Sequence, residues 1–167
     1  MTPAPAPDLD LDLDLQLATQ CPDLPSRTDF ARWIAAALTG HKTPASLTLR
    51  IVDRDESAEL NLTYRGKDGP TNVLSFPFEC PPGLPAGDPA HALLGDLAVC
   101  APLVAAEAEA QGKPAAAHWA HLTVHGTLHL LGHDHGDAAE AEAMEALETE
   151  ILTGLGFPPP YDTDEDS

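Results

Sequence analysis

Residues 125–135 read His-Gly-Thr-Leu-His-Leu-Leu-Gly-His-Asp-His, and the spacing of the histidines in this stretch indicates one helix and its end. His125 and His129 are four residues apart, so in a helix their side chains lie on one face, within reach of a single ion. Gly132 can end that helix in the left-handed conformation, and the chain can then turn back and bring His135 to the same ion. The pattern H-x-x-x-H-x-x-G-x-x-H therefore predicts a three-histidine metal site.

The number of protein ligands indicates the kind of metal site. Three ligands leave one coordination position open, which is typical of catalytic zinc sites and not of structural ones. Imidazole ligands without a redox signature favour one Zn²⁺ ion, so the first hypothesis is a metal-dependent hydrolase. The competing interpretation is a cluster of ordinary histidines with satisfied hydrogen bonds. Six of the eight histidines lie between positions 118 and 135, and this concentration favours the metal site.

His118 and His121 also lie on or near the face of His125 and compete as ligands. A site made of His121, His125 and His129 would need three successive turns of a straight helix to point at one atom. We therefore expect His135 to be the third ligand, and His118 and His121 to be supporting or surface groups.

The length, apolar content and cysteines indicate an ordinary intracellular domain. A chain of 167 residues suits one domain with its own core. It contains no apolar run of membrane-spanning length, and the N-terminal residues do not have the pattern of a secretory signal. Three scattered cysteines, Cys21, Cys80 and Cys100, fit a reducing compartment. We expect a cytoplasmic protein without a membrane partner.

The net charge of −19 argues against unaided binding to nucleic acid. The acidic residues concentrate near both ends of the chain and in residues 140–150, however. Four of the eight basic residues, Arg50, Arg54, Arg65 and Lys67, fall within eighteen positions. A local positive site on an acidic protein is therefore a reasonable expectation.

The pattern of apolar residues predicts four strands followed or separated by five helices. We expect strands at 9–17, 45–52, 72–78 and 93–100, a loop at 80–92, and helices at 27–38, 56–64, 102–111, 115–131 and 137–153. Ser26 is the expected N-cap of the first helix, and Pro114 suits the first turn of the histidine helix. The prediction is a single α+β domain, a small mixed β-sheet packed against helices, with the histidines on and just after a central helix. The domain is expected to cover residues 9–157, between a disordered tail at 1–8 and an acidic tail at 158–167.

Three segments together resemble a known family. Leu62–Pro77 reads LTYRGKDGPTNVLSFP, Leu94–Leu97 reads LGDL, and both precede the histidine stretch. In order and spacing they resemble the YbeY family of bacterial metal-dependent endoribonucleases of ribosomal RNA maturation, over about Ser26 to Gly154. The family motif H-G-x-L-H-L-x-G-Y-D-H places its three histidines on His125, His129 and His135.

The resemblance implies a function and partners. It implies a single-strand-specific endoribonuclease that acts in ribosomal RNA processing, at the 3′ end of 16S rRNA, and in ribosome quality control, through a water held by the three-histidine metal. It also implies contact with the small ribosomal subunit, through a ribosomal protein or an assembly GTPase. The nucleophile is either that water or the neighbouring 2′-OH of the RNA, and the sequence does not choose between them.

Two positions depart from the family pattern. His133 stands where the family usually has Tyr, and Asn72 where it usually has Asp. We expect the His133 side chain to point away from the metal rather than to add a fourth imidazole. An amide at position 72 loses any role that depends on charge but can still hydrogen-bond the turn.

Arg65 is the expected phosphate contact, because a planar guanidinium matches a phosphodiester with two parallel hydrogen bonds. The resemblance places Arg65 in the functional cleft, with Lys67 adding charge to substrate binding. The catalytic set is then Arg65 with the three histidines. The alternative for Arg65 is a surface ion pair with Asp68.

Two further carboxylates have possible supporting roles. Asp134 is expected to orient His135 or to accept a proton, because metal-bound imidazoles donate their second N–H to an acceptor. Capping of the turn is the equal alternative for Asp134. Asp96 is expected to form a structural hydrogen bond.

Two other functions compete with the nuclease. A metalloprotease of the metzincin type has this histidine spacing but carries Glu directly after the first histidine, where this chain has Gly126. No carboxylate between Ala115 and Leu131 can replace it. The other alternative is a metal-stabilised ribosome-assembly factor that binds without cutting.

Overall fold

The computed structural model describes residues 11–38, 45–78, 82–85, 93–132 and 137–158. In chain order the described elements are β1 (Leu11–Ala18), α1 (Arg27–Ala37), β2 (Ala45–Val52), α2 (Arg54–Arg65), β3 (Val73–Pro77), β4 (Leu93–Cys100), α3 (Ala101–Gln111), α4 (Ala115–Leu130) and α5 (Ala138–Gly154). The predicted strands at 45–52 and 93–100 have the predicted bounds. The predicted tail at 1–8, all but the first residue of the predicted tail at 158–167, and most of the predicted loop at 80–92 lie outside the described residues.

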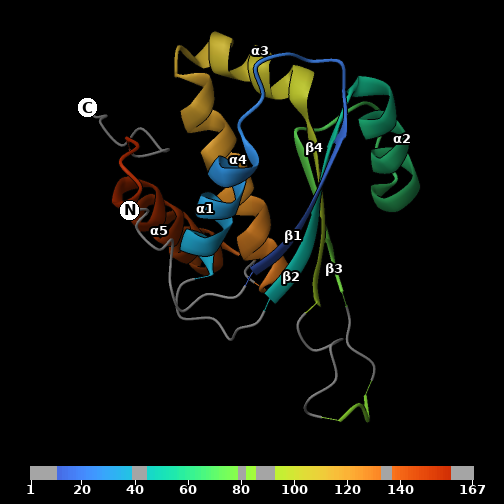
Figure 1. The fold of residues 1–167 in the computed structure, drawn as a ribbon, viewed down its shortest axis with the longest axis vertical. Helices are drawn as coiled ribbons and strands as arrows, with labels where there is room; N and C mark the ends of the chain where they lie inside the picture. The colour runs from blue at the N-terminus through green and yellow to red at the C-terminus, as the bar shows by residue number, and fades with distance from the viewer. Residues whose placement is uncertain (1–10, 39–44, 79–81, 86–92, 133–136, 159–167) are drawn as a thin grey trace.

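The sheet is mixed, as the sequence predicted. Its strand order is β1-β2-β4-β3, with β1, β2 and β4 parallel and β3 antiparallel to β4. β3 is therefore an edge strand of the sheet. Figure 1 shows α1, α4 and α5 on one side of the sheet and α2 on the other.

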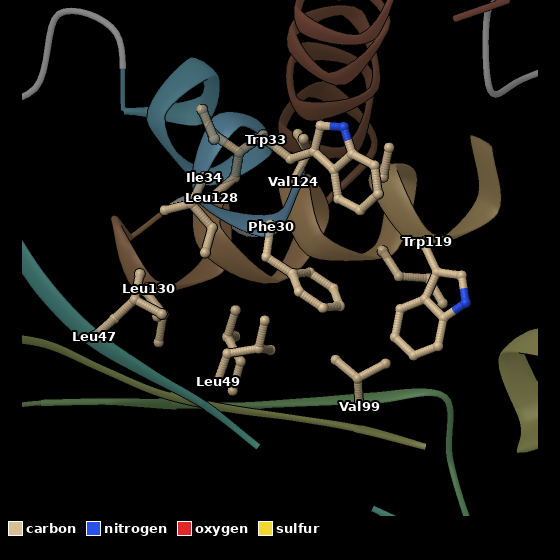
Figure 2. Close-up of a cluster of buried hydrophobic side chains, with 14 of the residues drawn as sticks. Phe30, Trp33, Ile34, Leu47, Leu49, Val99, Trp119, Val124, Leu128 and Leu130 are labelled. Carbon is tan, nitrogen blue, oxygen red and sulfur yellow. The ribbon is translucent and has the colours of Figure 1, made fainter. Parts of the chain in front are cut away.

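Alternation along the strands places the core on the side of α1 and α4. In β2, Leu47, Leu49 and Ile51 are buried, while the residues between them, which face α2, are partly exposed. Aromatic side chains of α1 and α4 pack above them, with the Phe30 ring centroid 5.7 Å from that of Trp119. Figure 2 shows this core between the helices and the sheet.

The helix boundaries follow from local capping. Ser26 caps α1 as predicted: its Oγ accepts from the Asp29 N–H at 3.1 Å, and the Asp29 carboxylate accepts from the Ser26 N–H at 3.3 Å. α2 begins two residues before the predicted start, after Asp53. The Asp53 carboxylate accepts hydrogen bonds from Thr19 and Gln20 at the end of β1 rather than from α2, so the usual capping signal is missing there.

Pro114 was expected in the first turn of the histidine helix, and it is the N-cap residue of α4, directly before that turn. Its missing N–H costs nothing at either position. Among the helices formed by the described residues, none is both long and apolar enough to span a bilayer.

Candidate metal centre

α4 lies very close to the sheet at Gly126. A Cβ atom added to Gly126 would stand 2.8 Å from Leu97 Cδ2 and 3.3 Å from Val73 Cγ2. Leu97, on β4, is fully buried. The residue after His125 therefore faces the sheet, and a glutamate general base of the protease type would not fit there.

His125 and His129 turn their Nε2 atoms toward each other. The two atoms are 3.1 Å apart, and the ring centroids are 4.6 Å apart. Two imidazoles bound tetrahedrally to zinc at about 2.0–2.1 Å would have their nitrogen atoms roughly 3.3 Å apart. Without an ion one hydrogen atom can bridge the two nitrogens, and a metal ion can take its place with little movement.

The helix ends as the sequence predicted. The Leu131 N–H donates to Thr127 and Leu128, the Gly132 N–H donates to His129, and Gly132 has a φ of 100°. The expected third ligand His135, together with His133 and Asp134, lies outside the described residues. Two of the three expected ligands, His125 and His129, are among the described residues. No group of three metal-binding side chains occurs among those residues.

A buried carboxylate that is absent from the predicted site contacts His125 and His121. Glu148 of α5 is fully buried; its Oε2 is 2.6 Å from His125 Nδ1 and its Oε1 is 3.0 Å from His121 Nε2. A sequence signal was available, because Glu148 is spaced four residues from both Met144 and Leu152, which are buried on the same face of α5.

His121 and His118 have carboxylate partners of their own. His121 Nε2 contacts Oε1 of Glu148, whereas the Nε2 atoms of His125 and His129 contact each other. His118 Nε2 is 2.8 Å from Oε1 of Glu107 on α3. Burial lowers the pKa of His118 below its usual value, partly opposed by the hydrogen bond to Glu107. Of the two, His121 contacts the carboxylate that also contacts His125, whereas the carboxylate partner of His118 belongs to α3.

Asn72 completes the cluster around Glu107. Its side-chain amide donates to Glu107 Oε1 at 3.1 Å, and its backbone oxygen accepts from the Cys100 N–H at 2.9 Å. An aspartate at position 72 would place a second carboxylate against Glu107. The Asn72 side chain thus links the start of β3 to α3, close to the C-terminal end of β4.

Arg65 and Lys67 are exposed at the C-terminal end of α2. Gly66 ends the helix with a φ of 67°, and Asn61 Nδ2 holds the following loop by donating to Gly69 O at 2.9 Å. No ion pair between Arg65 and Asp68 occurs in the described part of the chain, which leaves Arg65 exposed to solvent.

Edge strand β3 lies between this helix end and α4. The Tyr64 ring packs on Phe76 with centroids 5.0 Å apart, while the Oγ of the preceding residue, Ser75, lies 3.4 Å from Gly126 O of α4. Successive strand residues point to opposite faces, so α2 and α4 flank the same edge strand from its two sides. The helix that ends in Arg65 and the helix that carries the histidines therefore lie on opposite faces of edge strand β3.

The four basic residues that are close in sequence are not gathered in space. Arg50 is paired with Glu56, with nitrogen–oxygen distances of 2.6 and 3.1 Å. Arg54 opens α2 and Arg65 closes it, so their backbones are about 16 Å apart along the helix. Only Arg65 and Lys67 remain as a local basic pair.

Asp96 lies on the face of the sheet that carries α2. It is exposed and lines a cavity of about 390 Å³ together with Arg50, Tyr64 and Phe76. The structural hydrogen bond expected of the Asp96 side chain is not found among the described residues.

Comparisons with known proteins agree with the resemblance noted in the sequence. The family model described as Endoribonuclease YbeY matches residues 18–156. A protein named Endoribonuclease YbeY from Alkalilimnicola ehrlichii is 60% identical over 144 residues, covering 85% of each chain. One of the same name from Xanthomonas axonopodis pv. citri is 62% identical over 138 residues, covering 83% of this chain and 85% of the relative.

One solved structure supports the fold alone. The solution structure of TM1509 from Thermotoga maritima is similar with a TM-score of 0.53 and 22% identity, covering 93% of this chain and 96% of that one.

Proposed function

Since this chain belongs to the YbeY endoribonuclease family, we propose that it is a metal-dependent endoribonuclease that cuts single-stranded RNA during ribosomal RNA processing. The observation that carries the proposal is the pair of Nε2 atoms of His125 and His129, 3.1 Å apart on one face of α4. Both atoms are aimed at one point, as two ligands of one ion would be.

The residues present fit a zinc ion. His125 and His129 would hold it through Nε2, and His135 is the proposed third ligand. The hydrogen bond of His125 Nδ1 to Glu148 is the contact that metal-bound imidazoles usually make on their second nitrogen. When bound, zinc supplies Lewis acidity, which lowers the pKa of a water toward 7 and offsets charge on a phosphoryl oxygen.

The chain's own residues would orient the RNA at this centre. Arg65 would hold a phosphate through two parallel hydrogen bonds, with Lys67 adding positive charge beside it. Both lie at the end of α2, on the other side of edge strand β3 from α4. An RNA strand that passes around this edge could contact Arg65 with one phosphate and the histidines with another.

The acidity of the chain bears on its partners. With a net charge of −19 the protein would be repelled by RNA over most of its surface. We therefore propose that it acts in the cytoplasm on the small ribosomal subunit, docked by a ribosomal protein or an assembly GTPase, in maturation of the 16S rRNA 3′ end and in ribosome quality control.

A metal-depletion experiment on purified protein tests the proposed activity. The protein is treated with a chelator, dialysed, and assayed on single-stranded RNA, duplex RNA and single-stranded DNA before and after one equivalent of Zn²⁺ is restored. We expect cleavage of single-stranded RNA to vanish and return, with the two other substrates left intact. A zinc-loaded protein that cuts no RNA, with or without ribosomal subunits, would favour the non-catalytic assembly factor.

A matched pair of arginine variants tests the proposed phosphate contact. Arg65→Ala should keep bound zinc and the unfolding midpoint of the wild type but lower the rate of RNA cleavage at least tenfold. Arg32→Ala is the control, since Arg32 is an exposed arginine on α1 whose ion pair is with Asp29. Equal cleavage by the two variants would remove Arg65 from the mechanism.

A further inference from the structure

Glu148 has a carboxylate side chain on the buried, otherwise apolar face of α5. It has no exposed surface, and Met144 and Leu152, one turn away in each direction on α5, are buried beside it. A carboxylate removed from water is unfavourable unless hydrogen bonds compensate it. A leucine at position 148 would continue the apolar stripe of α5, so the carboxylate calls for a reason other than packing.

The two oxygens of Glu148 are each directed at one imidazole of α4. Oε2 lies 2.6 Å from His125 Nδ1, and Oε1 lies 3.0 Å from His121 Nε2. An ionised carboxylate can only accept hydrogen bonds, so both imidazole nitrogens must donate. The hydrogen of a neutral His125 is then on Nδ1, and the lone pair is on Nε2, the atom that faces His129.

We propose that Glu148 is the positioning residue of the metal centre: it fixes the tautomer and ring orientation of His125, and His121 holds the second carboxylate oxygen in place. The inference rests on the proposed function and deepens it. It assigns to the buried Glu148 of α5 a task that the sequence had suggested for Asp134 toward a different ligand.

His121 thereby gains a role that is distinct from metal binding. Its side chain is 14% exposed and its Nε2 contacts Glu148, with the His121 and His125 ring centroids 6.3 Å apart. By engaging Oε1 it keeps the carboxylate from rotating away from His125. The three side chains form a chain of contacts in which the carboxylate lies between the two imidazoles.

Three variants of α5 test the assignment. Glu148→Leu removes both acceptors while suiting the apolar stripe, and Glu148→Gln keeps one acceptor oxygen at similar volume. Glu145→Leu is the matched control, the same change at an exposed position of the same helix. Zn²⁺ affinity is measured by competition with a chelating indicator, and thermal unfolding of the metal-free proteins checks the fold.

The expected result is a 10- to 100-fold loss of zinc affinity in Glu148→Leu, the range seen when such supporting partners are removed. Glu148→Gln should lose less, and Glu145→Leu should match the wild type. If Glu148→Leu binds zinc as tightly as the wild type while His129→Ala does not, the positioning role is overturned and the metal centre stands. If His129→Ala binds zinc as the wild type does, the proposed metal centre itself is wrong.

A second measurement needs neither metal nor a folded Glu148→Leu protein. Long-range ¹H–¹⁵N NMR of the metal-free wild type reports which nitrogen of each neutral histidine carries the hydrogen. A hydrogen on Nδ1 of His125 supports the assignment, and a hydrogen on Nε2 overturns it.

Discussion

Gly126 should be required because no side chain fits between α4 and the sheet. In the variant Gly126→Ala the new Cβ would stand 2.8 Å from Leu97 Cδ2, well inside ordinary van der Waals contact. Leu97 has no exposed surface and its Cδ1 would lie 3.4 Å from the new Cβ, so any change of its side-chain conformation would take place inside the packed core. Relief by a shift of α4 would instead move His125, the neighbour of Gly126.

The magnitude follows from two opposing terms. Overpacking a well-filled core costs about 1–3 kcal/mol, whereas replacing glycine with alanine inside a helix gains roughly 1 kcal/mol. The net loss in the free energy of unfolding should be about 1 kcal/mol. Gly154 provides the control, because it is also helical and a Cβ there would have no atom within 4 Å. Gly154→Ala should therefore stabilise, by about 0.5–1 kcal/mol.

Urea denaturation of the metal-free proteins gives the difference between the two variants. We expect the unfolding midpoint to fall in Gly126→Ala and to rise in Gly154→Ala, with unchanged dependence on denaturant concentration. Adding Leu97→Val, which shortens the opposing side chain, should recover part of the loss as a coupling of about 0.5–3 kcal/mol. If both alanine variants stabilise by the same amount and the Leu97 change shows no coupling, the close approach is refuted.

Three further predictions concern stability. Because burial lowers the pKa of His118, the unfolded chain takes up its proton more readily, so stability should fall as pH drops below about 6.5. His118→Gln should lessen this fall in urea titrations between pH 7.5 and 5, and an unchanged slope would contradict the assignment. Asn72→Asp replaces the hydrogen-bond donor to Glu107 with a like charge, so the free energy of unfolding should fall by about 1 kcal/mol at pH 7 and by less at pH 5. An equal loss of free energy at both pH values would exclude repulsion between the two carboxylates. Ser26→Ala removes the cap of α1 and should lower the free energy of unfolding by about 1 kcal/mol, measured by urea denaturation.

Local patterns made much of the fold predictable. The alternation of apolar residues over 45–52 predicted the bounds of β2, and Ser26 predicted the start of α1. Gly132 ends α4 with a positive φ, as its position after the histidines implied. Each of these signals lies within a few residues of the feature it determines.

The rest depends on pairings between distant segments. The strand order β1-β2-β4-β3 is a matter of which strands meet, and no local pattern contains it. The sequence alone indicates no packing role for Gly126, because its contact with Leu97 joins residues far apart in sequence. In the sequence Glu148 is one of several acidic residues of a predicted helix, and its contact with His125 depends on how α5 packs on α4. The four basic residues that are close in sequence do not all lie together, because helix α2 separates Arg54 from Arg65.

Metal content and RNA cleavage, measured on the same samples, test the central claim most directly. The wild type, His129→Ala and the control His118→Gln are purified free of other nucleases and assayed on single-stranded RNA. The account predicts about one zinc ion per chain and cleavage in the wild type and in His118→Gln, and neither in His129→Ala. Retention of zinc and of the wild-type cleavage rate by His129→Ala would contradict it.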